Sequence, residues 1–416
     1  MSRIETALGR GVLHAADLRD RLDVSPATLM RMVRQAGPEI VRLGRGRATR
    51  YGLRQPWTAL DRARFPLFRV TDTGAVASAG ELMTLAARQS VWMPDGRLSE
   101  GLPVALADAR PSGFLGRHFA ATRTDLRLPS RLTDWADHHI LLAMSRRGED
   151  LPGNLIVGEE SVARWHALDA AAVTRDDYPA LAAATIAGHP PGSSAGGERP
   201  KFGVCVDGRH RLVKFASRGG TADVVARRWC DLLILEEIAL DTIDAHGIAA
   251  ARTTVIDTPS HWFLESERFD RVGARGRRGV LSLAALHDDP ADTWARAATK
   301  LREARRLTDG DARRLRWLDA FGALIGNTDR HQYNILFFTE DERPRLAPAF
   351  DHVSMLYAPT ADGQVLPRPF ARPHVTPDTV DVWSEAQEAA RHFWRRGSED
   401  ARLSEGMRTL CASNAR

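Results

Sequence analysis

The sequence is poor in cysteine and has no long apolar stretch, and both absences narrow the class of protein. Three cysteines occur among 416 residues, at Cys205, Cys230 and Cys411, and their spacing provides neither a disulfide framework nor a set of metal ligands. No uninterrupted apolar run approaches the roughly 20 residues that cross a bilayer. The first residues, Met1 to Glu5, lack the apolar core of a secretion signal. We therefore expect a cytoplasmic protein with no membrane partner.

What the sequence does contain is enough apolar material for several folded domains. Hydrophobic residues make up 43% of the chain and charged residues 27%, as in folded globular proteins, and 416 residues exceed one ordinary domain. The net charge of +5 is unevenly placed. Residues 1–54 hold eleven arginines and five acids, a charge of +6, which leaves −1 for the rest of the chain. A basic excess confined to one segment indicates a polyanionic partner, most simply DNA.

Residues 1–55 are predicted to form a winged helix-turn-helix domain. Helices are expected at 3–9, 15–22 and 26–35, and Pro26 suits the first position of the third. Two short strands around a Gly/Arg tip predict a hairpin wing, and the third helix of such a module enters the major groove. The residues expected to contact DNA are Ser25, Thr28, Arg31, Arg34, Gln35, Arg45, Arg47 and Arg50. An alternative is a small helical interaction domain with a solvated arginine face.

The middle of the chain carries little chemistry. Residues 56–66 are expected to be a linker, and from 67 to about 160 short apolar runs alternate with Gly and Pro. This pattern predicts a small β-rich subdomain with one helix at about 133–147. Further on, strands at 202–206 and 211–215 precede a long helix at 224–243, after which the chain is mainly helical.

The strongest chemical signal is the run from Asn327 to Phe338. Asp329 and Asn334 stand five residues apart on a predicted loop that leads into a β-rich run. That spacing is typical of phosphotransferases, in which the aspartate accepts the proton of the attacking hydroxyl and the asparagine binds Mg²⁺ on ATP. A further carboxylate, Asp351, supplies an oxygen ligand of the kind Mg²⁺ prefers. Each residue alone would more often be a turn or capping residue, but the combination indicates phosphoryl transfer.

Two upstream features agree with this chemistry. The Gly-rich segment 190–202 precedes a strand, and its backbone N–H groups could lie over phosphates, although alone it would more often be a flexible linker. Lys214, between Val213 and Phe215 in a predicted strand, is either a solubility charge on an edge strand or the ammonium that holds phosphates. The next helix carries Glu236 and Glu237, and a strand lysine paired with a helix glutamate is the ion pair that orients this lysine in kinases.

Taken together, these stretches resemble the HipA family of serine/threonine kinases, the toxins of bacterial toxin–antitoxin systems. The resemblance covers about residues 67–400 and rests on the runs 193–201, 212–215, 267–271, 327–334 and 346–351. It implies an α+β, bilobal protein-kinase-like fold, with a β-rich N-terminal subdomain and a mainly helical C-terminal lobe, preceded by the small winged-helix domain. The expected domains are a winged helix-turn-helix at 1–55, a linker at 56–66, the β-rich subdomain with the kinase N-lobe at 67–270, and the helical C-lobe at 271–416.

The resemblance also implies site residues and cofactors. With ATP and Mg²⁺ between the lobes, Asp329 would be the catalytic base and Lys214 would contact the phosphates with Glu236 as its partner. Asn334 and Asp351 would be the Mg²⁺ ligands. The other nucleotide-binding residues implied are Ser194, Ala195, Gly196, Gly197, Lys201, Glu267, Phe269 and His331, with the backbone at Glu267 and Phe269 meeting adenine. Ser193 and Ser194 are the candidate autophosphorylation sites.

The implied partners are a protein substrate, such as an aminoacyl-tRNA synthetase or another translation component, and DNA through residues 1–54; a homodimer stays open. An N-terminal DNA-binding module departs from the commonest family members, which depend on a separate DNA-binding antitoxin. Two alternatives to a protein kinase stay open. One is a DNA-binding regulator whose kinase-like body binds nucleotide but is catalytically weak. The other is a small-molecule kinase of the aminoglycoside or choline type, against which the Gly/Ser loop argues.

Overall fold

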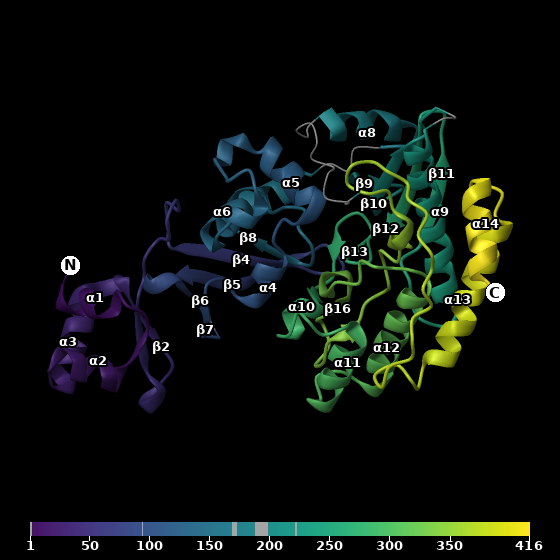
Figure 1. Cartoon of the computed structure of the whole chain (residues 1–416). Helices are drawn as coiled ribbons and strands as arrows, with labels where there is room; N and C mark the ends of the chain where they lie inside the picture. The colour runs from purple at the N-terminus through teal and green to yellow at the C-terminus, as the bar shows by residue number, and fades with distance from the viewer. Residues whose placement is uncertain (1, 94, 169–172, 188–198, 221–222) are drawn as a thin grey trace. The chain divides into compact units, whose positions relative to one another are not determined.

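The computed structural model describes residues 2–93, 95–168, 173–187, 199–220 and 223–416, which form two compact units (Figure 1). The first unit consists of Met1–Thr71, Ala75–Pro111 and Arg123–Leu168, and the second of Asp72–Gly74, Ser112–Thr122 and Asp169–Arg416. In neither unit do the described residues include a helix whose length and apolar character would let it cross a membrane.

The first unit begins with a helix–hairpin segment, residues 2–54. It contains α1 (Arg3–Leu8), α2 (Ala15–Leu22), α3 (Pro26–Ala36) and an antiparallel sheet in the order β1-β3-β2, made of Leu13–His14, Arg50–Leu53 and Ile40–Leu43. Helix α3 starts at Pro26 because Ser25 caps it, its Oγ accepting the Thr28 backbone N–H at 3.2 Å. Three helices and a hairpin thus lie where the sequence predicts them.

The hairpin of this segment packs against the sheet that comes after it in the chain. On β2, Val41 and Leu43 share an apolar cluster with Leu85 and Val91. The backbone N–H of Val12 donates to Gln89 Oε1 at 2.8 Å, further joining the two parts. Residues 2–54 are therefore not an isolated module, because part of their apolar surface belongs to a core shared with the neighbouring sheet.

The predicted linker at 56–66 needs correction. The Trp57 indole is buried and donates to the Leu85 carbonyl at 3.1 Å, and strand β4 (Arg64–Val70) begins inside the predicted range. Pro56 and Pro66 favoured a linker, but Pro66 is accommodated within β4, opposite Glu81 of the next strand. The last three residues of the predicted linker are therefore strand.

An antiparallel sheet in the order β7-β6-β5-β4-β8 forms the rest of this unit (Arg97–Glu100, Gln89–Met93, Val76–Thr84, β4 and Leu155–Val157). Its helices are α4 (Val104–Asp108), α6 (Asp137–Arg147) and α7 (Glu159–Ala167). The single predicted helix corresponds to α6, so the expectation of one helix was wrong. Helix α5 (Gly113–Thr122), which belongs to the second unit, lies in the range where the alternation of short apolar runs with Gly and Pro predicted a β-rich subdomain.

The second unit contains a four-stranded antiparallel sheet in the order β11-β12-β10-β9 (Thr253–Asp257, His261–Glu267, Arg209–Ser217 and Lys201–Val206). Since successive side chains on a strand point to opposite faces, β10 presents Val213 and Phe215 to one apolar cluster and Ala216 to the other. The first cluster contains α8 (Tyr178–Ala187), and the second contains the long α9 (Val224–Ala245). The sheet is therefore covered on both faces.

A helical core completes the second unit and positions the catalytic loop. It contains α10 (Leu283–Leu286), α11 (Trp294–Glu303), α12 (Asp309–Leu324), α13 (Trp383–Glu399) and α14 (Glu405–Asn414) (Figure 1). These helices share one apolar cluster with α9. A short sheet of β15 (Val280–Ser282), β16 (Leu336–Phe338) and β17 (Arg345–Leu346) lies beside them, and β13 (Arg271–Val272) pairs with β14 (Gly276–Arg277). The Asp329–Asn334 loop lies between the end of α12 and β16.

Candidate active site

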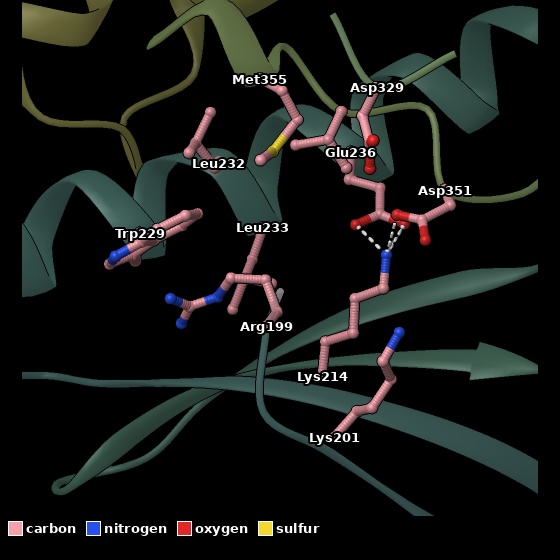
Figure 2. A pocket seen from close by; sticks show the side chains of 11 residues that line it. Arg199, Lys201, Lys214, Trp229, Leu232, Leu233, Glu236, Asp329, Asp351 and Met355 are labelled. Carbon is pink, nitrogen blue, oxygen red and sulfur yellow. Dashed lines mark hydrogen bonds and ion pairs between the residues drawn. The ribbon is translucent and has the colours of Figure 1, made fainter. Parts of the chain in front are cut away.

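Lys214 projects from the middle of β10 toward two carboxylates (Figure 2). Its Nζ donates to Glu236 Oε1 at 2.7 Å, to Glu236 Oε2 at 2.8 Å and to Asp351 Oδ1 at 2.5 Å. Because β10 lies between β12 and β9, and Lys214 is buried, an edge-strand solubility charge is excluded. Strand β10, helix α9 and the segment after β17 therefore meet at one ammonium group.

Helix geometry selects Glu236 over its neighbour. Adjacent residues on an α-helix point about 100° apart, so only one of the two glutamates of α9 can face the sheet lysine. Glu236 does so, with an exposed fraction of 2%. Glu237 instead accepts the Val255 backbone N–H at 2.7 Å and pairs with Arg402, also at 2.7 Å.

Burial and charge compete at this centre. Burial alone would lower the pKa of Lys214, but the Asp351 and Glu236 carboxylates outweigh it and hold that pKa above its ordinary value. Burial raises the pKa of Glu236, with Lys214 opposing. Burial would also raise the pKa of Asp351, but Lys214 and Lys201 outweigh it and hold it well below its usual range. At neutral pH Lys214 is charged and Asp351 is ionised.

Asp351 has a backbone φ of +56°, a left-handed conformation that non-glycine residues rarely adopt. Its local strain must be offset by the surrounding structure, and such outliers concentrate at functional sites. One support is adjacent, since Ala349 exchanges two backbone hydrogen bonds of 2.8 Å with the chain after α9. The carboxylate is thereby turned toward Lys214.

The predicted catalytic loop is ordered by its own asparagines. Asn327 Oδ1 accepts the Asp329 backbone N–H at 2.9 Å, and Asn334 Nδ2 donates to the Asp329 carbonyl, also at 2.9 Å. This contact uses the Asn334 amide nitrogen and leaves its oxygen on the opposite branch of the group. The Asp329 side chain is 54% exposed, and the Nε2 of His331 lies 3.9 Å from its Oδ1. Asp329 lines the same pocket as Lys214 and Asp351.

Buried side chains of α11 and α12 form hydrogen bonds to this loop and fix its position. Asp319 accepts the Arg330 Nε–H at 3.0 Å, the Trp294 indole donates to the His331 carbonyl at 3.0 Å, and Gln332 donates to a carbonyl before α11 at 2.7 Å. Sequence reasoning missed Asp319 and Trp294. Neither belongs to a motif, and their partners lie 11 and 37 residues away.

The remaining predicted nucleotide-binding residues divide into three groups. Lys201 opens β9 opposite Lys214 and lines the pocket with it. Phe269 contacts Phe338 and Phe350, with ring centres 6.0 and 5.6 Å apart. The backbone N–H of Glu267 donates to the Arg252 carbonyl at 2.9 Å, and the expected contact of the Glu267 backbone with adenine stays a prediction. Outside the described residues lie Ser193, Ser194, Ala195, Gly196 and Gly197.

Several pocket residues were not predicted at all. Arg199 and Trp229 line one end, where the guanidinium carbon stands 4.0 Å from the indole ring centre. The apolar wall consists of Leu232, Leu233, Val353 and Met355. A sequence signal existed for Arg199, since it lies two residues before Lys201 at the end of the Gly-rich segment.

The predicted DNA-contacting residues lie on α3 and the hairpin. Arg31, Arg34 and Gln35 are exposed on α3, and Arg45 and Arg47 are exposed between β2 and β3. The other three are more constrained: Ser25 is the cap of α3, its hydroxyl donates to Thr28 Oγ1 at 3.1 Å, and Arg50 is half-buried in β3.

The donor set fits one kind of metal better than others. Across the described part of the chain, no three His, Cys, Asp or Glu side chains converge to form a metal cage. Mg²⁺ commonly takes one or two protein oxygens and completes its shell with phosphate and water. The Asn334 amide and the Asp351 carboxylate offer oxygens of this kind, so the residue types fit Mg²⁺ shared with a nucleotide; Asp351 lines the pocket, whereas Asn334 is not among its lining residues.

Sequence comparison identifies relatives of both parts of the chain. The family described as "YjjJ-like toxin, middle domain" matches residues 61–166, and that described as "HipA-like C-terminal domain" matches residues 193–412. The protein named "Toxin YjjJ" from Escherichia coli (strain K12) is 33% identical over 428 residues, covering 99% of this chain and 96% of that protein.

Solved structures resemble the chain at the level of fold. A chain of the Shewanella oneidensis MR-1 complex of HipA, HipB and its operator DNA matches with a TM-score of 0.54 and 15% identity, over 84% of this chain and 95% of that one. The Helicobacter pylori proinflammatory kinase CtkA matches with a TM-score of 0.37 and 11% identity, over 53% of this chain and 87% of that one. The mixed helix-and-sheet fold is therefore that of HipA-like proteins.

Proposed function

The chain belongs to the HipA-related family of YjjJ-like toxins, and from this premise we propose that it is an ATP-dependent kinase acting on serine or threonine side chains of proteins. One observation carries the proposal. Lys214 contacts both Glu236 and Asp351, and Asp329 lines the same pocket. A charged lysine with a helix glutamate, a metal-ligating carboxylate and an exposed aspartate is the set of groups that phosphoryl transfer requires.

Each residue has a distinct part in the transfer. Lys214 holds the nucleotide phosphates and is itself oriented by Glu236. The oxygen of the substrate hydroxyl bonds to the γ-phosphorus while Asp329 accepts the hydroxyl proton. The bond between the γ-phosphorus and the β–γ bridging oxygen breaks, and ADP leaves. Mg²⁺, held by Asn334 and Asp351, would neutralise charge on the phosphates. Asn327 and Asp319 fix the loop, so catalysis consists mostly of positioning and electrostatics.

The direct test is incubation of the purified full chain with γ-³²P-labelled ATP and Mg²⁺, alone and with cell extract. Labelled protein bands that disappear when EDTA is added are the expected result. Mass spectrometry of the labelled chain then tests Ser193 and Ser194 as autophosphorylation sites. Nucleotide binding without labelled protein at any Mg²⁺ concentration would contradict the kinase and favour a DNA-binding regulator with a catalytically weak body.

A second activity is proposed for the helix–hairpin segment, namely DNA binding as a winged helix-turn-helix. The net charge of +6 on residues 1–54 and the exposed arginines of α3 and the hairpin support it. The Shewanella HipA structure is a complex with HipB and operator DNA; in the present chain, α3 would enter the major groove, and the arginines of α3 and of the hairpin would contact the flanking phosphates.

Arg31→Ala/Arg34→Ala is expected to weaken DNA binding at least about tenfold and to reduce the slope of log affinity against log salt by about 2, since each phosphate contact formed on binding releases about 0.9 counterion. Fluorescence anisotropy with duplex DNA between 50 and 200 mM salt measures both. Arg19→Ala is the matched control, because Arg19 already pairs with Asp20 at 2.7 Å. An unchanged slope would remove α3 from the interface.

Substitution is a sharper test than deletion here. Removing residues 1–54 would uncover Leu85 and Val91, which share an apolar cluster with Val41 and Leu43. A truncated chain could lose activity through exposure of this core alone. The double arginine variant leaves the cluster intact, so its kinase activity is expected to equal that of the unaltered chain.

A further inference from the structure

The Arg199 end of the pocket has a chemistry of its own. In Figure 2 the Arg199 guanidinium extends toward Trp229, while the Lys214 ammonium meets Glu236 and Asp351. The guanidinium carbon lies 4.0 Å from the Trp229 ring centre, and one terminal nitrogen donates to the Phe215 carbonyl at 2.7 Å. Stacking on a ring leaves the in-plane N–H edges of an arginine available to a ligand.

Among the residues that the structure describes, this cation has no balancing acid. The described carboxylates that line the pocket belong to Glu236, Asp329 and Asp351, and two of them are bound to Lys214. Burial lowers the pKa of Arg199 to about 9, and the opposing influence comes from the Cys230 thiol rather than from a carboxylate. Its Nε is buried with no hydrogen-bond partner among the residues that the structure describes. A half-buried arginine with no described carboxylate partner is costly to the fold, which indicates a ligand.

We propose that Arg199, seated on Trp229, forms a second phosphate subsite that binds the terminal phosphate of ATP. The proposal rests on the kinase function above and deepens it. A planar guanidinium matches a phosphate in a bidentate fashion, and Lys201, which pairs with Lys214 across β9 and β10, lines the same pocket. In Figure 2 the described carboxylates of the pocket, those of Glu236, Asp329 and Asp351, lie on the side of Lys214. The Arg199 end therefore carries a positive charge, which favours a negatively charged group there.

The consequence is discrimination between ATP and ADP. ADP can bind Lys214 and the metal-binding residues, but it lacks the γ-phosphate that Arg199 would contact. A phosphorylated side chain or free phosphate carries the same chemical group, so the subsite could also accept it. Competition by inorganic phosphate and by phosphoserine separates these sources from the nucleotide.

The test compares dissociation constants of MgATP and MgADP for the full chain, by isothermal titration calorimetry, in the unaltered protein, Arg199→Met and Arg199→Lys. Arg199→Met is expected to raise the Kd for MgATP about 10-fold to 100-fold, as for loss of a charged hydrogen bond, while the Kd for MgADP changes less than about twofold. Arg199→Lys is expected to lie between, because lysine keeps the charge without the fork.

Two controls separate binding from structural support. Arg228→Met removes a different partly buried arginine, which lies on α9, donates to the Tyr357 carbonyl at 3.1 Å and does not line this pocket. It should leave the ATP/ADP ratio unchanged. The melting temperature of Arg199→Met should not fall by more than about 3 °C, since replacing a half-buried charge that has no carboxylate partner by an apolar chain is often neutral or stabilising.

The outcomes are distinguishable. If the unaltered chain binds neither nucleotide, the kinase function itself fails. If it binds both but Arg199→Met keeps the ATP/ADP ratio and also keeps any competition by phosphate or phosphoserine, the subsite is refuted while the kinase function stands. If Arg199→Met lowers the affinities for MgATP and MgADP equally, or greatly lowers the melting temperature, Arg199 has a structural role and the subsite is also refuted. Loss of phosphoserine competition alone assigns the subsite to a phosphorylated side chain.

Discussion

Asp329→Asn is expected to lower the rate of phosphoryl transfer about 10²-fold to 10⁴-fold, the usual contribution of a positioned general base. Asparagine has the same size and can still accept a hydrogen bond, but it cannot take the proton of the attacking hydroxyl. The loop itself should not change, because Asn327 and Asn334 hold it through the backbone N–H and carbonyl of residue 329. MgATP affinity is therefore expected to stay within about threefold.

Single-turnover transfer from γ-³²P-labelled ATP measures the rate, and calorimetry measures the binding. Asp341→Asn serves as the matched control, since Asp341 is an exposed carboxylate that pairs with Arg345 at 3.2 Å and does not line the pocket. A normal rate in Asp329→Asn would remove this residue from the chemistry. A rate loss accompanied by an equal loss of MgATP affinity would show that Asp329 supports binding rather than proton transfer.

The parts of the fold that the sequence predicted are those with strong local signals. The apolar periodicity of α9, the Ser25–Pro26 start of α3 and the strand after Asn334 each depend on neighbouring residues, and each lies where it was expected. Helix α5 was missed because Gly113 and Gly116 lowered its local helix propensity while packing determined its state. The predicted linker failed for a similar reason, since the burial of Trp57 is a tertiary contact.

The site was predictable in its composition but not in its connections. Lys214 and Asp351 are 137 residues apart, and no periodicity brings them together; only the order of residue types suggested it. The composition also indicates the site, because the chain contains just three lysines, Lys201, Lys214 and Lys300. Two of the three line one pocket. In a chain that otherwise uses arginine, a compact ammonium there indicates a need for a point charge that can move between a carboxylate and a phosphate.

Lys214→Met is expected to abolish phosphoryl transfer and also to lower the free energy of unfolding by about 3–5 kcal/mol, the usual cost of removing one partner of a buried ion pair. Glu236 is the reason, because it is 2% exposed and would be left without its cation. The Asp351 side chain is 26% exposed, so water can hydrate its carboxylate when the ammonium is absent. Urea unfolding at pH 7 measures the loss. As a control, Arg313→Ala should cost about 1 kcal/mol or less, because the Arg313–Glu385 pair lies at the surface.

The pH dependence and a double variant show whether the buried carboxylate causes the loss. Burial raises the pKa of Glu236, so in Lys214→Met its ionised form destabilises the fold at neutral pH, and protonation relieves that cost as pH falls. The deficit relative to the unaltered chain should therefore shrink between pH 7 and pH 5, a range in which Asp351 of the unaltered chain, whose pKa Lys214 and Lys201 hold well below its usual value, stays ionised. Lys214→Met/Glu236→Met should recover most of the stability, since an apolar pair can replace a buried ion pair at little cost. A deficit that is independent of pH and is not recovered in the double variant would mean that the loss arises from packing, and that the ammonium is not what holds α9 to the sheet.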